Sequence, residues 1–340
     1  MITKVLNITE HFPAFPTLKE LLQPRTKNTD VFSPVFLDIE TTGLSRSAAE
    51  LYLIGAVIPE GNSWMLYQWM AEHSSEEPSL LRAFSEKLKN CTCLISYNGD
   101  RFDLPFLETK AASYGLSSLS EGKESLDLYL LLKPLQKLLK LERMKQPYLE
   151  EFLDIKNRVY SDGKECISLY RKFLKTRDTL LADTVTGHNL EDLLGLGRIS
   201  EMTAYLAFTE GICHAADASV EDGHLLMTLS LPHSLPACFS CGTKDFYLTG
   251  EDRQARLIVH SADGRFRIYY SNYKDYYYMA SEDTAIPKAL GACMDKKLLS
   301  SATRDTCYTW FTCTEAFLSD CSQQDQYLLH TLPYLISTLR

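Results

Sequence analysis

The sequence predicts an α/β fold in which a mixed sheet with flanking helices precedes a smaller β-rich domain. An apolar, β-prone run over 35–40 is followed by two further strand-like runs, over 51–58 and 64–70, which together predict a three-stranded meander. Helical and strand-like periodicities then alternate, so parallel strands joined by helical crossovers extend the meander. After residue 211 short strand-like runs replace the helical pattern.

The elements of the predicted sheet follow one another closely. The first 33 residues contain Pro13, Pro16 and Pro24, so we expect an irregular lead-in with one short helix at Thr17–Leu22. The strand over 35–40 ends in the turn residues Thr42-Gly43, and a hairpin loop over 59–62 joins the second strand to the third. A helix over 79–88, a fourth strand over 93–97 and a helix over about 104–114 complete this part.

The remaining chain is first helical and then β-rich. Leucines recur three and four residues apart from Leu126 to Thr209, which predicts helices over 128–141, 148–153, 167–174 and 179–208. Predicted strands then cover 224–231, 245–248, 257–260, 265–270 and 276–279, with Asp263-Gly264 as a hairpin turn. We therefore expect a lead-in over 1–33, an α/β domain over 34–212 and a β-rich accessory domain over 220–340.

The composition is that of an ordinary globular protein. The 340 residues are 45% hydrophobic and 11% aromatic, and the formal net charge is −9. This charge argues against a protein that coats nucleic acid through bulk electrostatic attraction. The first residues contain no apolar signal core, and no apolar run is long enough to cross a bilayer. We expect a soluble, cytoplasmic protein whose ten cysteines are thiols, with no membrane contact, and the sequence identifies no protein partner.

Two carboxylates interrupt the first apolar strand. Asp38 and Glu40 are two residues apart, so both side chains leave the strand on the same face. Burying two carboxylates side by side costs several kcal/mol unless a positive charge lies between them. Mg²⁺ and Mn²⁺ prefer carboxylate oxygens, so a divalent cation would satisfy the pair. For this motif alone, a strand end at which both acids reach water is the simpler interpretation.

Two other segments contain residues of the same kind. Asp103 lies near the carboxyl end of the fourth predicted strand, where α/β proteins place their sites, although aspartate there also suits a helix N-cap. His188 and Asp192 are four residues apart in a helical pattern and share one helix face. Taken alone, a solvated helix face explains this second pair.

Together these segments resemble the three exonuclease motifs of the DEDD superfamily. The segments are Phe-Leu-Asp38-Ile-Glu40-Thr-Thr-Gly-Leu, Ser-Tyr-Asn98-Gly-Asp-Arg-Phe-Asp103-Leu-Pro-Phe and His188-Asn-Leu-Glu-Asp192-Leu-Leu. The chain is most similar to the YprB-like branch, and the resemblance covers about residues 34–210. One departure concerns His188, which precedes its aspartate by four residues, whereas five is usual in histidine-type members and four is the spacing of tyrosine-type members.

The resemblance implies a ribonuclease-H-like fold and a metal-dependent 3′–5′ exonuclease that cleaves single-stranded DNA or RNA from 3′ ends. It implies that two Mg²⁺ or Mn²⁺ ions are held by Asp38, Glu40, Asp103 and Asp192, with Asp38 bridging them. His188 would take or orient the proton of the attacking water. Thr41, Leu44, Asn98 and Phe102 would contact the substrate, although core packing explains Leu44 and Phe102 equally well. A catalytically silent nucleic-acid-binding or scaffold protein on the same fold is the alternative.

Three weaker patterns have ordinary structural explanations. Cys238 and Cys241 form a C-x-x-C pair, but a structural zinc needs two further ligands and no second pair follows. Lysines at helical spacing suggest a phosphate track, although a solvated amphipathic face explains them better; they are Lys133, Lys137 and Lys140. The tyrosines between 269 and 278 suggest a stacking platform for bases, but tyrosine is also a good strand residue.

Overall fold

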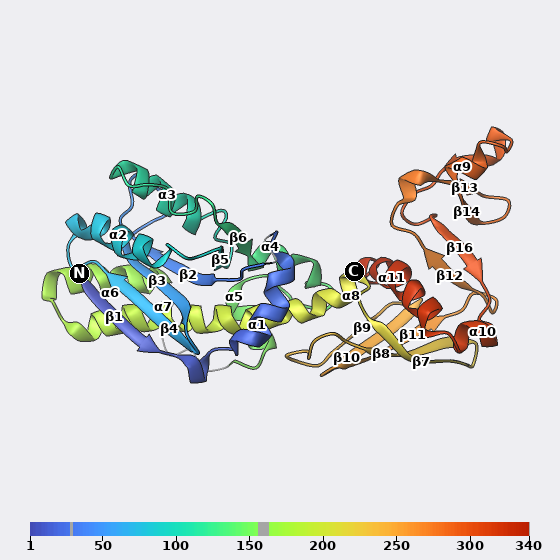
Figure 1. Ribbon diagram of the computed structural model, residues 1–340, viewed down its shortest axis with the longest axis horizontal. Coiled ribbons are helices and arrows are strands. Elements are labelled where there is room, and N and C mark those ends of the chain that lie inside the picture. The colour runs from blue at the N-terminus through green and yellow to red at the C-terminus, as the bar shows by residue number, and fades with distance from the viewer. Residues whose placement is uncertain (28–29, 156–162, 340) are drawn as a thin grey trace. The chain divides into compact units, whose positions relative to one another are not determined.

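The computed structural model describes residues 1–27, 30–155 and 163–339. The chain forms two compact units, which we call the N-terminal unit (Met1–Lys133 with Glu142–Thr203) and the C-terminal unit (Pro134–Leu141 with Ala204–Arg340) (Figure 1). Among the described residues, no helix combines the length and the hydropathy that spanning a bilayer requires.

The N-terminal unit is built on a six-stranded mixed sheet of order β1-β4-β3-β2-β5-β6. The predicted meander is present as β2 (Pro34–Thr41), β3 (Leu51–Glu60) and β4 (Ser63–Met70), with antiparallel pairing throughout. Strand β5 (Cys93–Ser96) is parallel to β2, and β6 (Glu124–Asp127) is parallel to β5. The predicted α/β class and the mixed sheet are therefore confirmed.

The prediction of an irregular lead-in over residues 1–33 is wrong at its start. Strand β1 (Ile2–Asn7) pairs with β4 along its whole length, from Ile2 opposite Met70 to Asn7 opposite Met65. Only two of its side chains are partly buried, because β1 is an edge strand, so its sequence lacks a strong apolar alternation. The short predicted helix is present as α1 (Phe15–Leu22).

Helices cover both faces of this sheet and divide the side chains of β2 between them. Apolar residues of α2 (Glu77–Lys87) and α3 (Asp103–Ser113) form a core with the odd-numbered residues of β2, which are Val35, Leu37 and Ile39. On the opposite face, α7 (Thr179–Ser200) packs against β2 and β3 (Figure 1). Helix α6 (Gly163–Thr176) packs against α7. The even-numbered residues of β2 therefore face α7.

The helical region contains shorter elements than the predicted ones. The helix predicted over 128–141 ends early, as α4 (Leu128–Leu132) and a 3₁₀ turn at Lys133–Leu135, because Pro134 disfavours a continuing helix and Lys140 has a left-handed φ of 53°. Helix α5 (Gln146–Phe152) agrees with the prediction. The helix predicted over 179–208 is α7 followed by a 3₁₀ segment at Glu201–Tyr205 and α8 (Leu206–Glu210).

The C-terminal unit is β-rich, as predicted, and its main sheet is antiparallel with the order β7-β8-β11-β10-β9. Its strands are β7 (His214–Glu221), β8 (His224–Ser230), β9 (Phe239–Gly242), β10 (Phe246–Glu251) and β11 (Gln254–His260). Strand β12 (Phe266–Tyr269) pairs with β16 (Tyr308–Phe311), and β13 (Tyr276–Met279) pairs with β14 (Thr284–Pro287) and β15 (Leu299–Ser301). Three helices complete the unit: α9 (Lys288–Gly291), α10 (Glu315–Leu318) and α11 (Cys321–Ser337).

The C-terminal unit differs from the predicted pattern in three respects. It begins at Ala204, includes residues 134–141, and ends in α11, a long helix with Pro333 in its interior.

The turn at Asp263-Gly264 exists, with φ of 52° and 73°, and an isolated bridge joins Ala262 to Arg265. However, the strands on either side do not form a hairpin, because β11 pairs with β8 and β10 whereas β12 pairs with β16.

Candidate metal centre

Strand β2 presents Asp38 and Glu40 on the face that α7 covers. Their positions follow from the two-residue period of a strand, since the intervening Ile39 packs into the core on the other face. Glu40 is buried at 9% exposure, and Asp38 is partly exposed. The interpretation of a strand end at which both acids reach water therefore does not hold for Glu40.

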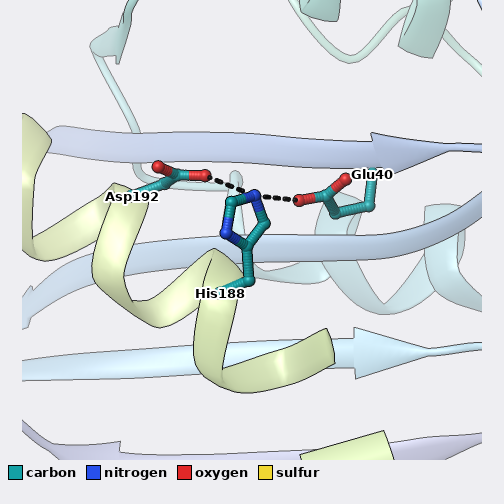
Figure 2. Close-up of side chains that lie close together, drawn as sticks. All are labelled: Glu40, His188 and Asp192. Carbon is teal, nitrogen blue, oxygen red and sulfur yellow. Dashed lines mark ion pairs between the residues drawn. The ribbon is translucent and has the colours of Figure 1, made fainter. Parts of the chain in front are cut away.

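Helix α7 places His188 and Asp192 opposite the strand. The Nε2 atom of His188 lies 3.3 Å from Asp192 Oδ2 and 3.6 Å from Glu40 Oε1 (Figure 2). One ligand atom from each of these three side chains lies within 4.8 Å of the other two. His188 is only 7% exposed, so the alternative of a solvated helix face is wrong for this residue.

Asp103, the first residue of α3, contacts the backbone of β2 between Asp38 and Glu40. Its Oδ1 accepts a hydrogen bond of 3.3 Å from the backbone N–H of Ile39. That part of β2 is open on this side because β5 pairs with β2 only as far as Phe36 opposite Ile95. The N-cap of α3 is Phe102 and no side chain caps the helix there, so N-capping does not account for Asp103.

Burial and mutual repulsion raise the pKa values of these carboxyl groups. Burial, together with the nearby charges of Asp192 and Asp103, raises the pKa of Glu40 to about 8. Burial, with Asp127 and Asp192 nearby, raises the pKa of Asp103 to about 7. The pKa of Asp38 lies well above its usual range because of burial and of repulsion from Asp192, Glu40 and Asp103. Of these acids, Glu40 and Asp192 group with His188 as candidate metal ligands, whereas Asp38 and Asp103 lie outside that group. Carboxylate oxygens are the ligands that Mg²⁺ and Mn²⁺ prefer.

These shifts predict a pH dependence for the stability of the metal-free protein. A carboxyl group with a raised pKa holds its proton more tightly in the folded chain than in the unfolded chain, whose value is about 4. The resulting stabilisation is complete below about pH 4 and is lost as the pH rises towards the folded pKa values of about 7 and 8. Thermal unfolding in EDTA should therefore show a falling midpoint between pH 5 and about pH 8.

Glu40→Gln should flatten this dependence, because it removes one of the shifted groups and part of the repulsion on the others. Glu251→Gln, an exposed carboxyl in β10, is the matched control and should leave the slope unchanged. A midpoint that rises over this pH range in both the wild type and Glu40→Gln would contradict the electrostatic account.

The structure adds two residues beside Asp38 for which the sequence analysis predicted no role. Asn189 Nδ2 donates to Asp38 Oδ2 at 2.8 Å, and Asn189 Oδ1 accepts from Gln68 Nε2 at 2.8 Å. Gln68 Nε2 also donates to the carbonyl oxygen of Thr186 at 2.7 Å. All of these groups except Asp38 are buried, so the chain of hydrogen bonds fixes the Asp38 carboxylate from behind.

Gly55 makes this arrangement possible. It is the residue opposite Asp38 in the β2–β3 register, and a Cβ at this position would lie 2.0 Å from Asn189 Oδ1 and 2.7 Å from Leu193 Cδ1. An isolated glycine in an apolar strand marks a close approach of another segment, so the sequence contained a usable signal here.

Tyr52 orients Glu40, and Asp127 fixes the loop that precedes Asp103. The register of β2 and β3 shifts after Glu40, and the hydroxyl of the unpaired Tyr52 donates to Glu40 Oε2 at 3.3 Å. Asp127 Oδ1 accepts from the backbone N–H groups of Asn98 and Tyr129, at 2.8 and 2.9 Å, which fixes the loop that leads to Asp103. Asp127 ends β6, a four-residue strand too short and polar to predict from sequence.

The residues expected to contact substrate lie in different environments. Leu44 is 84% exposed, so core packing does not explain it, whereas Phe102 packs against the core beside Phe106. Asn98 is partly buried in the loop before α3 and has a φ of 62°. The Thr41 hydroxyl donates to the carbonyl oxygen of Gly43 at 2.8 Å and so stabilises the turn after β2.

The cysteine pair shows no comparable cluster of ligands. Cys238 is exposed and Cys241 is buried in β9. Within 1–27, 30–155 and 163–339, Glu40, His188 and Asp192 are the only His, Cys, Asp or Glu residues that group as candidate metal ligands.

Comparisons with known proteins relate the chain to one superfamily. A family model for the RNase H superfamily matches residues 35–204, which is half of the chain. Human three-prime repair exonuclease 1 is 37% identical over 59 residues, which are 17% of this chain and 19% of that protein. The family B DNA polymerase of the archaeon Pyrobaculum calidifontis aligns with 53% of this chain and 25% of its own, at 15% identity and a TM-score of 0.42. The chain thus spans about a fifth of the human exonuclease and a quarter of the polymerase.

Proposed function

The chain belongs to the RNase H superfamily, and from this premise we propose that it is a metal-dependent 3′–5′ exonuclease of single-stranded DNA or RNA. One observation carries the proposal: Glu40 of β2 and His188 and Asp192 of α7, distant in sequence, place ligand atoms within 4.8 Å of one another. Asp103 of α3 accepts a hydrogen bond from the backbone of Ile39, beside Glu40. A bound cation would offset the repulsion within this buried group of acids without protonating them.

Asp38, Glu40, Asp103 and Asp192 would hold two Mg²⁺ or Mn²⁺ ions. Bound ions in such a site activate a water molecule and stabilise the leaving oxygen of a phosphodiester displacement. The four carboxylates supply the oxygen ligands that these hard cations prefer, and Asn189 holds the Asp38 carboxylate in one orientation. Tyr52 does the same for Glu40 through its hydroxyl.

His188 would act on the proton of the attacking water. Its Nε2 atom faces both Glu40 and Asp192, so the ring lies at the same place as two of the proposed ligands (Figure 2). A histidine side chain can accept a proton from water or orient the water molecule. The four-residue spacing to Asp192 suits this role, because residues i and i+4 of a helix share a face.

The exposed Leu44 side chain supports a single-stranded substrate. It stands in the turn directly after the strand that carries Asp38 and Glu40, where an apolar side chain can pack against a terminal base. The preference for a 3′ end rests on the similarity to human three-prime repair exonuclease 1. Labelling the two ends of the substrate separately tests this end preference.

Single-stranded DNA and RNA of one sequence, each labelled at the 5′ end, provide that experiment. With Mn²⁺ or Mg²⁺ the label should appear in a ladder of shortened strands, and EDTA should abolish the ladder. The same strands labelled at the 3′ end should release labelled mononucleotide at once. Release of mononucleotide from the 5′ end would overturn the polarity, and binding without cleavage under each metal would favour the silent nucleic-acid-binding alternative.

A further inference from the structure

The two-stranded sheet of the C-terminal unit presents arginines and aromatic rings on one face. In the β12–β16 pair, Arg267 lies opposite Trp310 and Tyr269 lies opposite Tyr308. Because side chains alternate along a strand, these four residues share a face, and Arg265, two residues before Arg267, belongs to it as well. We call this face the Arg–Trp surface.

The guanidinium groups and rings of the Arg–Trp surface lie against one another. The Cζ atoms of Arg265 and Arg267 are 4.6 and 4.3 Å from the centre of the Trp310 ring, and Arg267 Cζ is 4.6 Å from that of Tyr308. Asp283 accepts hydrogen bonds from the Tyr308 hydroxyl at 2.5 Å and, through its carbonyl oxygen, from Trp310 Nε1 at 2.9 Å. The rings are therefore held in place, while Arg265 is exposed and Trp310 is partly exposed.

The Arg–Trp surface lines a hollow of about 300 Å³, and a second hollow of about 690 Å³ adjoins it. Both are lined by Lys244, Asp245 and Thr338, and the second also by Lys137 and Lys140, which belong to the same unit. Five lysines and arginines thus line the two hollows, against two aspartates, Asp245 and Asp305. In a chain with a net charge of −9, this is a local excess of positive charge.

We infer that the Arg–Trp surface and the three lysines beside it bind a single strand of nucleic acid. Bases stack on aromatic rings and on guanidinium planes without regard to sequence, and lysines along a groove neutralise the phosphates between them. A positively charged groove combined with aromatic rings is typical of proteins that bind single-stranded nucleic acid. The choice of nucleic acid as ligand rests on the proposed function, but the binding itself can be measured without cleavage.

Two tyrosines of the suggested stacking platform over 269–278 already stack on other rings of the protein. Tyr269 stacks on Tyr334 of α11 at 3.5 Å, and Tyr270 stacks on Tyr276 at 5.3 Å, so these rings are already paired within the protein. The surface that remains for bases is centred on Trp310, which lies outside that stretch of sequence.

Fluorescence anisotropy of a labelled single-stranded oligonucleotide with the full chain in EDTA tests the inference. Arg265→Ala and Trp310→Ala should each weaken binding by about tenfold, the loss expected for one stacking contact. Arg265 is exposed, so its variant remains informative if Trp310→Ala fails to fold. Lys137→Ala/Lys140→Ala should lower the slope of log K against log salt by about 1.4, as the loss of two phosphate contacts requires for a single strand.

Lys296→Ala/Lys297→Ala is the matched control, because it removes two exposed lysines of the same unit that line neither hollow. Unchanged binding in the surface variants, an equal loss in the control, or no binding by the wild type at low salt would each overturn the inference. Binding that depends on the surface in a protein that cleaves nothing with Mn²⁺ would uphold the inference and overturn the proposed nuclease. Cleavage by a protein whose binding is unchanged in the surface variants would overturn the inference and uphold the proposed nuclease.

Discussion

Asp192→Asn should reduce phosphodiester cleavage by roughly a thousandfold and raise the thermal midpoint of the metal-free protein at pH 8. The substitution keeps the shape of the side chain and removes one charge from the proposed cation site. It also removes the largest charge repulsion acting on both Asp38 and Glu40. Loss of activity with a gain in stability is the signature of a ligand cluster, because a merely structural aspartate would lose both.

Asp183→Asn is the matched control for this prediction. It changes the same chemical group on the same helix, but Asp183 is 58% exposed and pairs with Lys4 at 2.6 Å. A surface ion pair of this kind contributes about 0–1 kcal/mol, so both the activity and the thermal midpoint should stay close to those of the wild type. Cleavage by Asp192→Asn at the wild-type rate would show that Asp192 is not part of the metal site.

Gly55→Ala should destabilise the N-terminal unit by about 1–3 kcal/mol and reduce cleavage by at least tenfold. The new methyl group would lie 2.0 Å from Asn189 Oδ1. This oxygen accepts a hydrogen bond from Gln68 Nε2, so it cannot move aside freely. Relief requires α7 to move away from β3, and α7 carries His188 and Asp192. Both chemical denaturation and the oligonucleotide assay measure the effect.

Gly43→Ala is a suitable control for the stability measurement. A Cβ at Gly43 would meet only Ala49 Cβ at 3.5 Å, which is an ordinary contact. The free energy of unfolding should change by less than about 0.5 kcal/mol. Equal unfolding free energies for Gly55→Ala and the wild type would show that α7 does not approach β3 as closely as described.

The sequence was informative wherever a strand or helix carries its own pattern. The strands β2, β3 and β4 are long and apolar, so their residues alone predicted the meander and set Asp38 and Glu40 on one face. The strands β1 and β6 were not predicted, because neighbouring strands rather than their own residues place them in the sheet. Helix α11 was missed for a similar reason, since Pro333 interrupts its pattern while packing against β7, β12 and α8 holds it.

Some residues of the candidate site could likewise be predicted from sequence, and others could not. Acids in an apolar strand, and a histidine four residues from an aspartate, are unusual enough to notice without a structure. The residues that orient them are ordinary in sequence: Gln68, Asn189 and Asp127 acquire their roles from contacts with segments far away in the chain. Such contacts depend on the packing of α7 and on the parallel pairing of β5 with β6, which no local pattern specifies.

Anomalous scattering from crystals grown with Mn²⁺ would examine the proposed cation cage itself. We expect manganese peaks enclosed by the oxygens of Asp38, Glu40, Asp103 and Asp192, and a loss of those peaks in crystals of Asp38→Asn. Manganese bound only elsewhere on the protein, with this region still empty in the wild type, would contradict the account.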